Sequence, residues 1–125
     1  MNARIIAFTA IVTLLTVGAA WTHHNNIRFD PEKLVTVTGT LSRLDWRNPH
    51  VYMYIDARND RGDIQTWSLE CQPPNFFAIR KISRADFENN LGRAVTVEVR
   101  PARDGSPNGA LWKMTGPDGK VLMAR

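Results

Sequence analysis

The sequence predicts an all-β domain with one short helix, folded as a small OB-like antiparallel barrel of five or six strands. Segments in which apolar and polar residues alternate recur between turn signals, as the strands of one sheet do. A stretch with helical spacing separates the third of these segments from the fourth. The first segment is long and contains a glycine, as a strand that bends around a barrel would. An open β-sandwich of the same strands is the alternative.

Three strands are predicted in the first half of the domain. Residues 34–44 are rich in threonine and valine, and Gly39 within them predicts a bulge or a bend. Residues 50–57 and 64–71 alternate with period two, which predicts two strands with one apolar face each. The turn residues 59–63 between them predict a hairpin.

A helix and the remaining strands are predicted in the second half. Two prolines open a segment whose apolar residues have the spacing of a short amphipathic helix, namely Phe76, Phe77, Ile79 and Ile82. Ser83, followed three residues later by Asp86, predicts a capped turn. Residues 94–100 and 110–115 predict strands, and residues 121–123 predict a short final one.

The first residues have the pattern of a secretory signal peptide. Arg4 precedes an apolar run over residues 5–17, and the small residues 18–20 suit a signal peptidase. The apolar run is shorter than the roughly 20 residues of a membrane-spanning helix. We therefore expect cleavage after Ala20, a periplasmic location and no stable membrane anchor in the mature chain.

Cleavage there leaves 105 of the 125 residues, enough for one domain. The predicted organisation is a signal peptide over 1–20, an N-terminal arm over 21–33 and the barrel over 34–125. Without Arg4 the chain has 15 basic and 12 acidic residues, a net charge of +3. This mild excess suits anionic partners and does not require nucleic acid, so none is expected. The single cysteine, Cys71, is expected to be a small buried residue.

The OB-like prediction places a ligand site on the outward face of the second and third strands. In this fold, ligands bind there between the loop after strand one and the loop between strands four and five. The sequence supplies aromatic rings, carboxylates and cations to that region. The expected ligand-binding residues are Trp46, Asn48, His50, Tyr52, Tyr54, Glu70, Arg103 and Asp104. A solvated sheet face with two ordinary turns is the other interpretation of the same pattern.

Histidines near the predicted mature N-terminus suggest a metal site. Cleavage after Ala20 makes His23 the third residue after a free amine, so the amine, two amide nitrogens and the imidazole supply four nitrogens in one plane. That geometry suits Cu(II). His24 and His50 are the further candidate ligands, and a flexible arm with solvated histidines is the alternative.

Catalysis has little support in the sequence. The chain contains no nucleophile elbow, no phosphate-binding loop and no paired Cys-x-x-Cys ligands. No catalytic residue is therefore predicted.

Several short motifs resemble a family of small exported bacterial proteins of unknown function. The resemblance covers nearly all of the predicted mature chain, and its most specific element is Trp46-x-Asn48-Pro49-His50. It implies a small β-barrel in the periplasm or envelope, with no established activity. The other motifs are His23-His24, Phe29-Asp30, Val-Thr-Val-Thr-Gly at 35–39, Trp67-x-x-Glu70, Pro74-Asn75, Arg-Asp-Gly-Ser at 103–106 and Pro-Asp-Gly-Lys at 117–120.

Three functions are compatible with these observations. The first is a periplasmic binding module that recognises a small or oligomeric envelope ligand, such as a carbohydrate. The second is a copper-handling protein that uses the mature N-terminus and its histidines. The third is an interaction subunit that meets another envelope protein on the same face.

Overall fold

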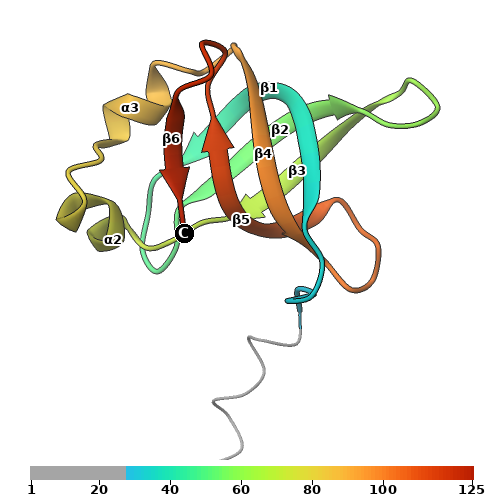
Figure 1. The fold of residues 1–125 in the computed structure, drawn as a ribbon, viewed down its shortest axis with the longest axis horizontal. Coiled ribbons are helices and arrows are strands. Elements are labelled where there is room, and N and C mark those ends of the chain that lie inside the picture. The colour runs from blue at the N-terminus through green and yellow to red at the C-terminus, as the bar shows by residue number, and fades with distance from the viewer. Residues whose placement is uncertain (1–27) are drawn as a thin grey trace, which may run out of the picture.

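The computed structural model describes residues 28–125, which form six strands and two short helices around one core (Figure 1). No helix in this part of the chain is long and apolar enough to span a membrane. The elements in chain order are β1 (Val35–Asp45), β2 (Tyr52–Arg58), β3 (Ile64–Glu70), α2 (Pro74–Ile79), α3 (Arg84–Glu88), β4 (Ala94–Pro101), β5 (Asn108–Thr115) and β6 (Val121–Ala124).

The strands close into a five-stranded barrel, with β6 added beside β5. The sheet order is β3-β2-β1-β4-β5-β6, and pairing between β3 and β5 completes the ring. This closure confirms the small OB-like barrel and excludes the open sandwich. The prediction that every strand pair is antiparallel is wrong for β3 and β5, which pair in parallel. A ring with an odd number of strands cannot alternate in direction all the way round, so one neighbouring pair must be parallel.

The inward positions of the strands build the core, as the alternation predicted. Val51, Met53 and Ile55 are fully buried, and so are the side chains of Leu69 and Cys71. The Cys71 thiol lies in the core and donates to the Leu69 carbonyl oxygen at 3.6 Å. Burial raises the pKa of the Cys71 thiol far above its ordinary value. Cys71 is therefore an unreactive core residue.

The predicted single helix is wrong, because two helices follow β3 and lie together at one side of the barrel (Figure 1). Lys81 has a left-handed backbone with φ 58°, which ends the first helical segment. Ser83 then starts α3 through the predicted capping box with Asp86. Phe77 from α2 and Phe87 from α3 are fully buried, whereas Ile79, predicted on the same apolar stripe, is 78% exposed.

Gly39 was predicted to mark a bulge or a bend in β1, and the bulge lies elsewhere. The pairing of β1 with β2 shifts between Leu41 and Arg43, while Gly39 stays in register opposite Val95 of β4. A Cβ atom on Gly39 would lie 2.4 Å from the Asp56 carbonyl oxygen. Glycine is present because β1 crosses the backbone of β2 too closely for a side chain.

Candidate functional site

Glu70, at the end of β3 on the outer face of the barrel, is the centre of a polar cluster. Tyr52 Oη donates a hydrogen bond of 3.4 Å to Glu70 Oε2. His50 Nε2 lies 3.7 Å from Glu70 Oε1, and an Arg28 guanidinium nitrogen lies 3.9 Å from Oε2. The Glu70 side chain remains 25% exposed. These four residues (Arg28, His50, Tyr52 and Glu70) are called the Glu70 cluster below.

Strand register and one loop contact position the cluster. Tyr52 and Glu70 are direct partners in the antiparallel pairing of β2 with β3, so their side chains share a face. The His50 ring is held by a 2.9 Å contact between Nδ1 and the Cys71 carbonyl oxygen. Because a carbonyl oxygen only accepts, Nδ1 carries the proton, and Nε2 is the atom that faces Glu70.

Arg28 connects the cluster to the loop between β4 and β5. The Arg103 amide donates a 3.1 Å hydrogen bond to the Arg28 carbonyl oxygen. Phe29 pairs with Ala102 through an isolated bridge, which continues this connection. The segment before β1 was predicted as an arm, and none of its residues was among the predicted ligand-binding residues. Its contribution depends on a pairing between residues more than 70 positions apart, which no local sequence pattern reveals.

Tyr52 is flanked by opposite charges. The Arg47 guanidinium carbon lies 5.4 Å from the centre of the Tyr52 ring, within cation–π range. Burial is the main reason why the pKa of Tyr52 is raised, and the charge and hydrogen bond of Glu70 add to the rise. The positive charges of Arg28 and Arg47 act in the opposite direction. Tyr52 therefore stays protonated and can donate its hydroxyl proton near Glu70.

The Glu70 charge gives a prediction for titration of Tyr52. Tyr52 and Tyr54 are the two tyrosines of the chain, so a Tyr54→Phe background leaves one to observe. In that background, we expect Glu70→Gln to lower the pKa of Tyr52, because an anion that disfavours tyrosinate is removed. An ultraviolet absorbance titration measures this shift. Asp63→Asn, in the β2–β3 hairpin, is the control, and an equal shift there would contradict the assignment.

Asp104 organises the loop between β4 and β5. Its Oδ1 accepts hydrogen bonds from the Ser106 hydroxyl at 2.5 Å and the Ser106 amide at 2.9 Å. These bonds lower the pKa of Asp104, and the nearby Arg28 charge contributes in the same direction. Asp104 thus shapes the loop and lies within electrostatic reach of Arg28. The Arg103 side chain is exposed at the same loop.

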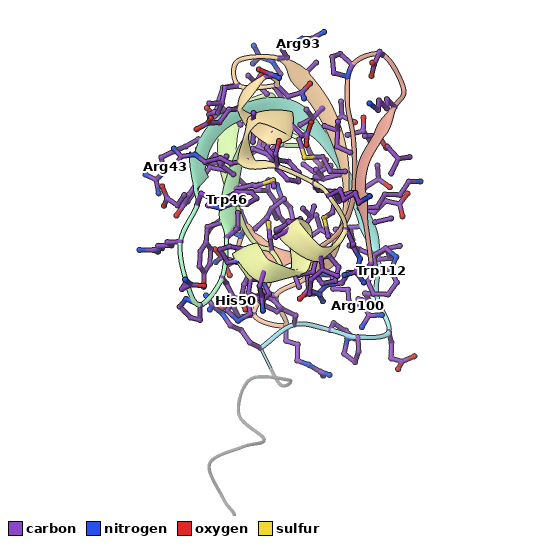
Figure 2. The ribbon with its side chains drawn as sticks, turned by 90° about the vertical axis from the view of Figure 1, so that its left-hand side faces the viewer. Arg43, Trp46, His50, Arg93, Arg100 and Trp112 are labelled. Carbon is purple, nitrogen blue, oxygen red and sulfur yellow. The ribbon has the colours of Figure 1, made fainter. Side chains whose placement is uncertain are left out.

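Among the described residues, three of the predicted ligand-binding residues form no hydrogen bond or ion pair with the Glu70 cluster. Trp46 packs at the barrel end, with ring centres 5.3 Å from Phe77 and 5.9 Å from Phe87. Figure 2 shows Trp46 away from His50, which lies at the lower end of the view. Tyr54 donates a 3.2 Å hydrogen bond to Asp45, and Asn48 is exposed before a cis bond to proline. The structure brings together His50, Tyr52 and Glu70, with Asp104 near Arg28.

The predicted copper site falls largely outside the described residues. His23 and His24 both precede residue 28, so nothing in the structure bears on their geometry. Within residues 28–125, no group of three or more histidine, cysteine or acidic side chains is placed to hold a metal ion. His50, the third candidate ligand, has its ring nitrogens directed at Cys71 and Glu70. Copper binding stays a prediction.

Fold and site together define a small OB-like barrel with a polar cluster on the outer face of β2 and β3. The chain belongs to DUF6152, a family of unknown function, whose pattern matches residues 11–111. That range includes the whole Glu70 cluster. No curated protein and no solved structure matches the chain.

Proposed function

We propose that this domain is a periplasmic binding module that recognises a carbohydrate of the cell envelope at the Glu70 cluster. The observation that carries the proposal is the contact set of Glu70 on the face where OB folds bind oligosaccharides. The periplasmic part rests on the signal-peptide pattern of residues 1–20.

The chemistry of the cluster suits a ligand rich in hydroxyl groups. The Glu70 carboxylate is acceptor-only and has about four lone-pair positions, more than its present partners use. Arg28 and Arg47 are both exposed and carry several N–H donors each. The half-buried Tyr52 ring adds apolar surface beside them. A sugar presents this combination of hydroxyl groups and apolar ring faces.

The test is calorimetric titration of the purified domain with chito-, malto- and galacturonate oligosaccharides of equal length. We expect saturable binding of at least one, and a loss of about tenfold or more in Glu70→Gln, since hydrogen bonds to a charged acceptor contribute roughly 1.5–3 kcal/mol each. Glu88→Gln on α3 is the matched control, because Glu88 is paired with Arg84 at 2.6 Å and belongs to another surface.

Two results would overturn the proposal. If no oligosaccharide binds, the carbohydrate function is contradicted. If Glu70→Gln and wild type bind with equal affinity, the binding site is not the Glu70 cluster. Mass spectrometry of the protein recovered from the periplasm checks the export part. A mass that begins at Trp21 supports it, and a protein that retains residues 1–20 in the cytoplasm contradicts it.

A further inference from the structure

The most exposed large apolar side chain among residues 28–125 is that of Ile79, the last residue of α2. Its side chain is 78% exposed, whereas Phe77, two positions earlier, is fully buried. The two helices project from one side of the barrel, at the left of Figure 1. Because Phe77 holds α2 against the core, Ile79 is a fixed apolar projection on the surface.

An open apolar hollow of about 520 Å³ adjoins Ile79. Asn75 and Ala78 of α2 line this hollow, and they lie one helical turn and one residue before Ile79. The Trp46 ring and Ile82 contribute further apolar walls. Figure 2 looks onto this side of the molecule, with Trp46 next to the two helices. The apolar surface therefore continues from Ile79 into the hollow.

Two cations follow Ile79 directly. The Arg80 guanidinium carbon lies 3.6 Å from the centre of the Phe76 ring, and Arg80 Nη1 donates a 3.3 Å hydrogen bond to the Phe76 carbonyl oxygen. Lys81 is exposed and lines the hollow itself. Long cationic side chains cover apolar surface with their stems and keep their charge in polar surroundings. Ile79, Arg80 and Lys81 are called the α2 tip below.

The absence of acidic neighbours distinguishes Ile79 from the other exposed large apolar residues of the described chain. These are Leu34, Ile64, Leu91 and Val121. Each of the four has an aspartate or glutamate within three positions in the sequence. Around Ile79, residues 71–85 contain three cations and no acidic residue. The α2 tip therefore combines apolar surface with positive charge.

The acidic side chains that come next in the sequence have partners at α3. Asp86 accepts hydrogen bonds from the Ser83 amide at 2.7 Å and from the Ser83 hydroxyl at 2.9 Å. Glu88 is paired with Arg84 at 2.6 Å. The charges adjacent to Ile79 are those of Arg80 and Lys81.

We propose that the α2 tip docks reversibly on an anionic phospholipid bilayer. Ile79 enters the boundary between head groups and acyl chains, while Arg80 and Lys81 contact the lipid phosphates. Apolar side chains bordered by lysine and arginine are typical of protein surfaces that lie in the membrane interface, and anionic lipids attract such cations. The α2 tip shares no residue with the Glu70 cluster, so the proposal does not depend on carbohydrate binding.

The experiment is co-sedimentation with vesicles of phosphatidylcholine alone, and of phosphatidylcholine and phosphatidylglycerol in equal amounts. The protein begins at Trp21, because the apolar run of residues 5–17 would itself insert into a bilayer, and every described helix and strand lies after residue 28. We expect binding to the anionic vesicles that exceeds binding to phosphatidylcholine and weakens with added salt.

Two kinds of variant test the α2 tip. Ile79→Ser should lower the partition coefficient about tenfold or more, as expected for an isoleucine that no longer leaves water. Arg80→Gln and Lys81→Gln should each lower it about fivefold, the effect of one cation at an anionic membrane surface. Equal binding of Ile79→Ser and wild type, or no binding of wild type to anionic vesicles, would overturn the proposal.

Matched controls lie on the β2–β3 hairpin. Ile64 is 61% exposed and follows Asp63 directly, and Arg61 is an exposed cation of the same turn. We expect Ile64→Ser and Arg61→Gln to bind anionic vesicles within about twofold of wild type, since distant exposed charges act weakly. Losses in these variants equal to those at the α2 tip contradict a specific docking surface.

A fluorescent label reports which residue enters the bilayer. The cysteine of the described chain, Cys71, is buried, so a nitrobenzoxadiazole label attaches to the new thiol of Ile79→Cys or of Ile64→Cys. We expect anionic vesicles to increase the emission and shift it to the blue for the label at position 79 alone. Vesicle binding without this change places the docking surface elsewhere. Self-association that requires Ile79, in a protein that does not bind vesicles, makes the α2 tip an interface between copies and overturns the lipid assignment.

Discussion

Replacing Phe77 by alanine is expected to lower the free energy of unfolding by about 3–5 kcal/mol, the range for loss of a buried phenylalanine. Phe77 is fully buried and contacts three aromatic rings. Its ring centre lies 5.3 Å from those of Trp46 and Phe87, and 5.5 Å from that of Phe76. Truncation leaves a cavity where the loop after β1, α2 and α3 meet, and these segments cannot close it without separating from the barrel.

Chemical denaturation monitored by circular dichroism measures the Phe77→Ala effect. Ile79→Ala on the same helix is the matched control, because Ile79 is 78% exposed and its loss should change stability by no more than about 0.5 kcal/mol. Similar losses in the two variants would show that α2 does not cover the barrel end through Phe77. A large loss of stability in Phe77→Ala but not in Ile79→Ala supports a packing role for Trp46, whose ring contacts that of Phe77.

Replacing Gly39 by alanine is expected to destabilise the domain by about 1–3 kcal/mol, the range for overpacking a close-packed interior. The added Cβ would lie 2.4 Å from the carbonyl oxygen and 2.9 Å from the carbonyl carbon of Asp56. It would also lie 2.9 Å from Ile55 Cγ2. Because two of these atoms are backbone, β1 and β2 must move apart at the point where the barrel bends.

Thermal or denaturant unfolding compares Gly39→Ala with Thr40→Ala. Thr40 is the next residue of β1 and is exposed, so its truncation should change stability by no more than about 0.5 kcal/mol. Equal stability of Gly39→Ala and wild type would contradict the close approach of β1 to β2. A loss confined to Gly39→Ala confirms that this glycine is required for strand packing.

Strand register connects the Glu70 cluster with β4 across the closed barrel. Tyr52 is opposite Glu70 across β2 and β3, Glu70 is opposite Ala110 across β3 and β5, and Ala110 is opposite Arg100 across β5 and β4. The parallel pairing that closes the barrel therefore places Glu70 of β3 and Arg100 of β4 on either side of Ala110 of β5.

Much of the local structure follows from the sequence alone. Period-two alternation determined which side chains of β2 enter the core, because successive strand residues point to opposite faces. The turn residues between β2 and β3 predicted the hairpin that joins them. Ser83 and Asp86 predicted the start of α3. These features depend on residues only a few positions apart, so a short segment of sequence is enough to predict each of them.

Contacts between segments that are distant in the sequence were seen only in the tertiary structure. The parallel pairing of β3 with β5 follows from closing a ring of five strands, which no single segment encodes. Arg28 reaches Glu70 because its backbone pairs with the loop after β4. Trp46, predicted at the ligand site, packs on Phe77 and Phe87 instead, because two helices supply an apolar surface that binds its ring. Local sequence patterns identify the buried face of each strand and the turns between strands. Charged residues from distant segments come close to one another only when the strands close into a barrel.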